Sequence, residues 1–269
     1  MTKVTTSSKS PVRPYRIIVQ DSEDPGYVNK LLIGTPTTGL VRIEWVQARY
    51  GQVIPVNWSS VQMMQPIDSF VPLRFGVADA QNLIVKVALE QDMEWLLLIE
   101  HDTCLPPDGF IRFDEYIREA KVPVVSGLYY SRGRPSSPQV YRGRGTGAYT
   151  NFKPGDLVWC DGVATGCLLI HCGILREMWK DAPEYTAGRS GIVARRVFQE
   201  PRLMWFNPDN PGIYNSLSGT SDLEWSSHVI KDKYLARAGW TEIAKKKWPY
   251  LVDTRIFCRH LDPDGTSYP

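Results

Sequence analysis

The stretch that decides the fold is Glu94-Trp95-Leu96-Leu97-Leu98-Ile99-Glu100-His101-Asp102-Thr103. Its five consecutive apolar residues are too few for an ordinary helix, and they lack the alternation of a strand with one wet face. They therefore predict a short parallel strand that is buried on both faces. Pro106 and Pro107 cannot continue such a strand. Two acids, Glu100 and Asp102, consequently fall at its carboxyl end.

The two acids form a candidate cation site. Ligands of open α/β sheets bind outside the carboxyl ends of the strands. Paired carboxylates there suit a divalent cation that carries phosphate oxygens. The alternative is that the acids only mark the solvated end of a buried strand, and an acid-x-acid triplet by itself leaves the two interpretations about equal.

Short apolar runs and helical periodicities alternate on both sides of this stretch. Leu31 to Ile33 predicts a first strand, and residues 76 to 91 predict a helix that leads into the central strand. Residues 122 to 126 and 167 to 170 predict further buried strands. The alternation predicts an α/β protein whose mostly parallel central sheet is flanked by helices.

One folded domain is expected over residues 15 to 260. Residues 1 to 14, rich in Ser, Thr and Lys, predict a disordered N-terminal tail, and residues 261 to 269 a C-terminal tail. Residues 131 to 156 predict a basic excursion over the sheet edge. Residues 181 to 221 contain no convincing helix, and so long a segment favours a binding loop or lid.

Composition excludes several classes of protein. The 31 basic and 29 acidic side chains give a net charge of +2, too even for nucleic acid or an anionic membrane as the main partner. Five cysteines without a Cys-x-x-Cys motif indicate neither a disulfide framework nor a thiolate zinc site. We find no membrane span and no signal peptide, so a soluble cytoplasmic protein is expected.

Taken together, the motifs resemble the family-2-like, nucleotide-sugar-dependent glycosyltransferases of the GT-A fold. The resemblance runs from Leu31 to His260 and is strongest from Asp92 to Phe110. It also rests on the strand at 162 to 170 and on the Ser-Asp-x-x-Trp helix start at Ser221. The chain departs from the family by having Glu100 where Asp is frequent, and Ser221 where many members have Glu.

The resemblance implies a single Rossmann-like GT-A domain with an acceptor-side loop region and a metal site. Asp102 and His260 are its expected ligands. Manganese suits a mixed carboxylate and imidazole site better than magnesium does. The resemblance places the nucleotide sugar against the loop after the first strand and around the acidic triplet. The residues expected to bind it are Thr35, Pro36, Thr37, Arg74, Glu100, His101 and Gly166.

Some of these positions have a plainer explanation. The loop at 35 to 37 also suits an ordinary strand–helix turn, and Arg74 also suits a helix cap. Gly166 also suits tight packing, because a glycine lets the backbone come close to any neighbour.

A transferase also needs a base, because an acceptor hydroxyl is a poor nucleophile until its proton is removed. Asp222 matches the family's base position, at a helix start where the helix dipole favours the ionised carboxylate. Glu224 is the rival if the register of that helix differs by half a turn.

The predicted function is metal-dependent transfer of a sugar from a UDP or GDP sugar to a hydroxyl acceptor, with inversion. The acceptor is a glycan or another small molecule. A retaining transferase and a non-catalytic sugar-nucleotide-binding protein are the alternatives. A nucleic-acid-modifying transferase, with the loop from Arg132 to Arg144 on phosphates, is the third.

Overall fold

The computed structural model describes residues 30–55, 58, 75–143, 147–188, 191–210 and 212–269. The expected N-terminal tail and Arg74 lie outside the described residues. In this part of the chain, no helix has the length and apolar character needed to cross a bilayer.

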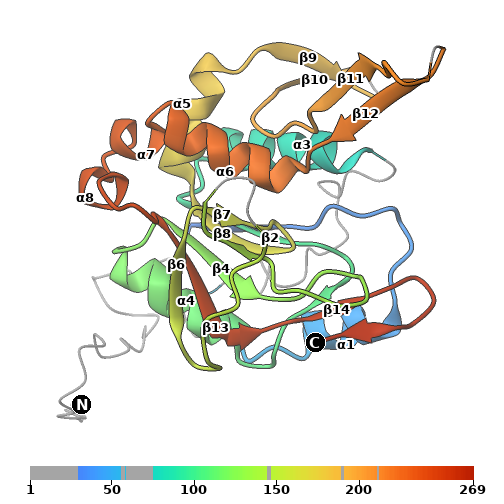
Figure 1. The fold of residues 1–269 in the computed structure, drawn as a ribbon. Helices are drawn as coiled ribbons and strands as arrows, with labels where there is room; N and C mark the ends of the chain where they lie inside the picture. The colour runs from blue at the N-terminus through green and yellow to red at the C-terminus, as the bar shows by residue number, and fades with distance from the viewer. Residues whose placement is uncertain (1–29, 56–57, 59–74, 144–146, 189–190, 211) are drawn as a thin grey trace, which may run out of the picture.

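A six-stranded sheet forms the centre of the molecule (Figure 1). Its strands, in spatial order, are β1 (Leu31–Gly34), β2 (Trp95–Ile99), β8 (Cys167–His171), β4 (Val124–Leu128), β13 (Tyr250–Phe257) and β6 (Leu157–Cys160). The five apolar residues of the deciding stretch form β2, and all of them are buried, as predicted.

The expectation of a mostly parallel, Rossmann-like GT-A sheet is wrong. Only β1–β2 and β4–β13 pair in parallel, whereas β2–β8, β4–β8 and β13–β6 are antiparallel. The error has a physical cause. An apolar run reports that a strand is buried on both faces, but it carries no information about direction. Strand β8 lies between β2 and β4 and runs against both.

Among the described residues, four smaller sheets accompany the central one, and each of their pairings is antiparallel. They are β9 (Glu184–Ala187) with β10 (Ile192–Arg195), β11 (Arg202–Phe206) with β12 (Tyr214–Ser218), β5 (Val140–Tyr141) with β7 (Gly162–Val163), and β3 (Thr103–Cys104) with β14 (Arg259–Leu261) and β15 (Ser267–Tyr268). The segment 261 to 269, expected as a tail, thus contributes β15 to a sheet.

Helices cover both faces of the central sheet (Figure 1). They are α3 (Val77–Glu90), α4 (Gly109–Glu119), α5 (Cys172–Asp181), α6 (Ser221–Lys231), α7 (Tyr234–Arg237) and α8 (Thr241–Ala244), whereas α1 (Ile43–Tyr50) packs against β3 and β14. Strand β2 shows how the core is divided. Leu96 and Leu98 pack with α3, α5 and α6, whereas Trp95, Leu97 and Ile99 pack with α4. The alternation of the strand therefore supplies two cores from one continuous apolar run.

Candidate functional site

The acidic triplet sits in a tightly held turn between β2 and β3. The backbone N–H of Glu100 donates to the carbonyl of Gly166 at 2.9 Å, and the Trp45 indole donates to the carbonyl of Glu100 at 2.9 Å. The N–H of Leu261 donates to the carbonyl of Asp102 at 2.8 Å. Elements from distant parts of the chain thus fix both acids in place.

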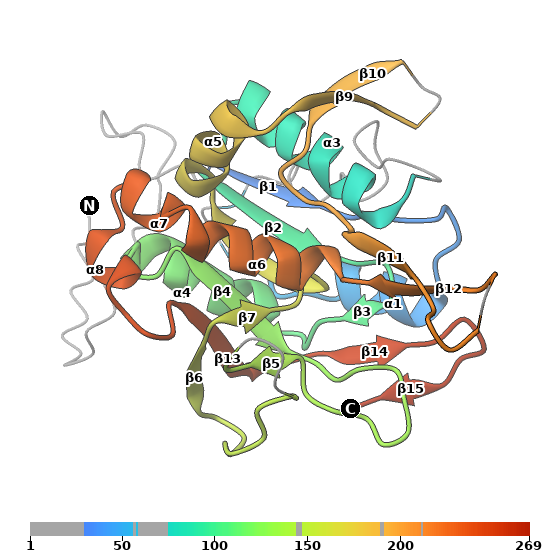
Figure 2. The same cartoon turned by 45° about the horizontal axis from the view of Figure 1, so that its top comes forward.

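Strand pairing brings His260 to Asp102. Strand β14 lies beside β3 (Figure 2), and in their register His260 lies opposite Thr103, the residue after Asp102. His260 Nε2 is 3.6 Å from Asp102 Oδ2. The two residues expected to share a cation are therefore neighbours.

The hydrogen bonding of His260 decides which of its nitrogens is free. Nδ1 lies 2.8 Å from the carbonyl oxygen of Tyr130. A carbonyl only accepts, so Nδ1 carries a proton, and Nε2 is the nitrogen that faces Asp102. Nε2 is buried and has no hydrogen-bond partner. A histidine held by a carbonyl through one nitrogen, with the other turned toward a carboxylate, is the usual arrangement of a metal ligand.

The protein's own ligands do not complete such a site. Among the described residues, no group of three or more His, Cys, Asp or Glu side chains could hold a metal ion. Asp102 and His260 can supply two ligands. Manganese and magnesium commonly take their remaining ligands from substrate phosphates and water. The residues present therefore fit a cation that arrives with a phosphorylated substrate.

Arg132 is a neighbour of Asp102 that the sequence alone does not assign. Its guanidinium lies 3.0 Å from Asp102 Oδ2 and 3.5 Å from Asp262 Oδ1. Burial would raise the pKa of Asp102, but the contact with His260 and the charge of Arg132 lower it below its ordinary value. Asp102 is therefore ionised at neutral pH. The basic character of residues 131 to 156 was visible in the sequence, but the carboxylate that Arg132 reaches was not.

The pKa of Glu100 is shifted in the opposite direction from that of Asp102. Burial, followed by the negative charges of Asp102 and Asp222, raises its pKa to about 7. Its Oε1 accepts a hydrogen bond from Thr165 Oγ1 at 3.0 Å, and Thr165 Oγ1 accepts one from Gln81 Nε2 at 2.9 Å. Gln81 is on α3, so these two hydrogen bonds connect Glu100 to the helix that covers the sheet. No sequence signal pointed to Gln81.

Asp222 faces the same cluster from the first turn of α6. Its charge acts on Glu100, Tyr129 and Tyr141, and Figure 2 shows α6 beginning near the carboxyl end of β2. Its Oδ1 accepts a hydrogen bond from the Leu223 N–H at 2.8 Å. Burial nevertheless raises its pKa above the ordinary value. Burial thus outweighs the hydrogen bonds that favour the ionised form of Asp222.

Glu224 is engaged elsewhere. Its Oε1 accepts a hydrogen bond from Gln199 Nε2 at 3.1 Å. Gln199 belongs to the long segment 181 to 221, so Glu224 contacts that segment. The helix that begins at Ser221 therefore places Asp222, and not Glu224, electrostatically close to Glu100.

The loop after β1 adjoins the acidic triplet. His101 Nδ1 donates to the carbonyl of Pro36 at 3.2 Å. Thr37 Oγ1 accepts from the Gly39 N–H at 3.1 Å, which is the local turn contact expected of an ordinary strand–helix connection. Thr35 Oγ1 is buried and has no hydrogen-bond partner. The loop thus combines a local turn with one unused buried hydroxyl.

Gly166 is explained by packing. Its N–H donates to the Tyr129 hydroxyl at 2.8 Å. A Cβ at this position would lie 2.6 Å from the Tyr129 hydroxyl oxygen and 2.8 Å from Thr103 Oγ1. Only glycine fits without moving these side chains. The space that a ligand was expected to occupy beside Gly166 is filled by the side chains of Tyr129 and Thr103.

Comparisons with known proteins add little to this geometry. No protein-family model matches the chain, and no curated protein matches it. A solved structure described as the crystal structure of A197 from STIV covers 88% of this chain and 92% of its own, at 15% identity and a TM-score of 0.47. At these values the likeness defines neither family nor function. Fold and site together define a mixed α/β protein with a candidate cation site at the strand ends.

Proposed function

We propose that this protein is a metal-dependent glycosyltransferase that moves a sugar from a UDP or GDP sugar to a hydroxyl acceptor with inversion. One observation carries the metal-dependent part of the proposal. His260 Nε2 is buried, has no hydrogen-bond partner, and lies 3.6 Å from Asp102 Oδ2. A buried nitrogen that makes no hydrogen bond is costly unless something binds it. A cation shared with Asp102 would satisfy it.

The sugar-nucleotide part rests on the resemblance of the sequence motifs. It does not depend on a parallel sheet, because Glu100 and His101 directly follow β2 and His101 contacts Pro36 of the loop after β1, whatever the direction of β8. Asp102 and His260 would hold manganese or magnesium. The bound cation would stabilise the negative charge on the departing diphosphate.

The remaining chemistry falls to the protein's own side chains. Asp222 would take the proton of the acceptor hydroxyl, and its raised pKa brings it closer to the working pH of a general base. Arg132, already beside Asp102, would offer its planar guanidinium to phosphate oxygens. A hydroxyl activated by a base on the far side of the sugar displaces the diphosphate directly, which inverts the anomeric carbon.

A thermal-shift panel of nucleotide sugars with and without manganese tests the proposal. A ligand that binds only the folded state adds about 2.7 kcal/mol of stability at one hundred times its Kd. We expect stabilisation by a UDP or GDP sugar that requires manganese. If no nucleotide sugar stabilises the protein under either condition, the proposal is wrong.

Product analysis then separates the remaining alternatives. NMR of the anomeric proton distinguishes inversion from retention. Metal-dependent binding without transfer or hydrolysis of any donor would instead identify a non-catalytic sugar-nucleotide-binding protein.

A further inference from the structure

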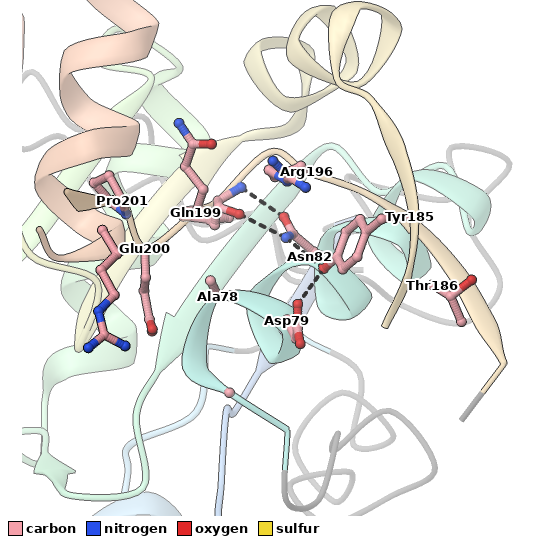
Figure 3. A pocket seen from close by; sticks show the side chains of 12 residues that line it. Ala78, Asp79, Asn82, Tyr185, Thr186, Arg196, Gln199, Glu200 and Pro201 are labelled. Atoms are coloured by element: carbon pink, nitrogen blue, oxygen red, sulfur yellow. Dashed lines mark hydrogen bonds between the residues drawn. The ribbon is translucent and has the colours of Figure 1, made fainter. Parts of the chain in front are cut away.

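A pocket lies over the first half of α3. It has a volume of about 510 Å³ and is bounded by α3, by β9 and by the chain from 196 to 202 (Figure 3). Asp102, His260, Asp222 and Glu224 do not line it. The sequence motifs gave no indication of this pocket.

Hydrogen bonds through Asn82 fix the walls of the pocket. Asn82 Nδ2 donates to the Phe198 carbonyl at 2.9 Å and to the Tyr185 hydroxyl at 3.0 Å. Asn82 Oδ1 accepts from the N–H groups of Val197 and Phe198 at 3.0 and 2.8 Å. The Tyr185 hydroxyl donates to Asp79 Oδ1 at 2.8 Å (Figure 3). The pocket is therefore shaped before any ligand binds.

The charges that line the pocket balance. Arg196 and Arg202 contribute two positive charges, and Asp79 and Glu200 contribute two negative ones. Arg202 and Glu200 are exposed at its mouth. An anionic ligand would be attracted by the arginines but repelled by the carboxylates, so the lining favours neither sign of charge.

We infer that this pocket binds a neutral carbohydrate, and that this carbohydrate is the acceptor. The acceptor role rests on the proposed function, whereas the binding does not. A sugar hydroxyl both donates and accepts hydrogen bonds. Guanidinium groups supply only donors and ionised carboxylates only acceptors, so a lining that carries both can satisfy neighbouring hydroxyls of one ring.

One residue that lines the pocket contacts the helix that carries the proposed base. Gln199, which lines the pocket, donates from Nε2 to Glu224 Oε1 at 3.1 Å. Glu224 and Asp222 both lie in the first turn of α6. A sugar held in the pocket would therefore approach the helix turn that carries the proposed base. Glu224 would act as a positioning residue, since it holds Gln199 in the wall.

Calorimetry or saturation-transfer NMR without donor or metal tests the binding. The probes are lactose, maltose and cellobiose, together with phosphorylated and carboxylate-bearing disaccharides of the same size. We expect at least one neutral disaccharide to bind, and Arg202→Ala and Glu200→Gln each to weaken it about tenfold, because each removes hydrogen bonds to a charged group.

Arg195→Ala is the matched control, because Arg195 precedes Arg196 but pairs with Glu184 at 2.8 Å and does not line the pocket. It should bind as the wild type does. Binding of the charged probes alone, binding of none, or unchanged affinity in both pocket variants would each overturn the inference. Neutral-sugar binding in a protein that shows no manganese-dependent nucleotide binding would retain this pocket and remove the proposed transferase activity.

Discussion

The strand-end cluster, formed by Glu100, Asp102 and His260, and the segment 181 to 221 differ in how the rest of the structure holds them. Glu100 and Asp102 lie in the turn between β2 and β3, and His260 lies on β14, with the backbone of the turn held by hydrogen bonds from distant elements. The long segment instead forms two hairpins, β9–β10 and β11–β12, that lie beside the helices and outside the central sheet (Figure 1). The contrast is between a turn held by long-range hydrogen bonds and two hairpins that lie outside the central sheet.

The hairpins carry apolar side chains that the central sheet does not bury. Met204, Trp205 and Phe206 on β11 are 60%, 47% and 50% exposed. A two-stranded hairpin is only marginally stable without a third strand or a packed helix. The β11–β12 hairpin should therefore open more readily than β2. Regions of low local stability are the usual source of substrate-closing motions.

The largest expected effect is a loss of turnover without a loss of donor binding. Asp222→Asn should lower turnover on the order of 10²-fold or more while leaving donor affinity nearly unchanged, because a base acts on the acceptor in the transition state. Steady-state kinetics with donor binding measured separately decides this. Glu224→Gln is the comparison. If it abolishes transfer while Asp222→Asn stays active, the base is Glu224.

The next effect concerns the metal. Asp102→Asn and His260→Ala should each weaken manganese-dependent nucleotide binding by roughly tenfold or more. Each variant removes a metal ligand, and the loss of a residue that only hydrogen-bonds to a metal ligand already lowers metal affinity by about that factor. Thermal shifts with and without manganese measure it. His228→Ala is the control, because His228 pairs with Asp232 at 2.7 Å on α6. Unchanged metal dependence in both site variants would remove this site.

A smaller effect follows from the raised pKa of Glu100. Because its pKa is about 7 in the folded protein and 4.5 ordinarily, its contribution to stability is complete below pH 4.5 and is lost as the pH rises through 7. Glu100→Gln cannot ionise. It should therefore be more stable than the wild type at pH 8, by about 3 kcal/mol, and nearly equal to it at pH 4.5.

Thermal unfolding at the two pH values checks this expectation. Glu90→Gln, at the exposed end of α3, should show no such difference. If the stability of Glu100→Gln and of the wild type depended equally on pH, ionisation of Glu100 would not lower the stability of the folded protein, and the expectation would be wrong.

The smallest expected effect sharpens the comparison between the two regions. Amides of 181 to 221 should exchange readily in the free protein and on the order of tenfold more slowly with nucleotide and manganese bound. Amides of β2 should be protected in both states. Hydrogen exchange followed by mass spectrometry resolves the two regions. Equal exchange of 181 to 221 in both states would make the hairpins fixed structure.

Much of the local structure could be predicted from sequence. The apolar run of β2, the acids after it and the helix at 76 to 91, observed as α3, are each confirmed. So is the helix start at Ser221. These features depend on residues close together in the chain, whose periodicity records which faces are buried. The resemblance added the pairing of Asp102 with His260, which periodicity could not supply.

Only the tertiary structure decided how these parts meet. The direction of β8 was invisible because burial on both faces looks the same in either orientation. The register of β14 on β3 sets His260 against Asp102, and the loop from β4 brings Arg132 to the same carboxylate. Whether Asp222 or Glu224 faces Glu100 depended on the packing of α6. Such contacts join residues far apart in the chain, and no local pattern records the packing that brings them together.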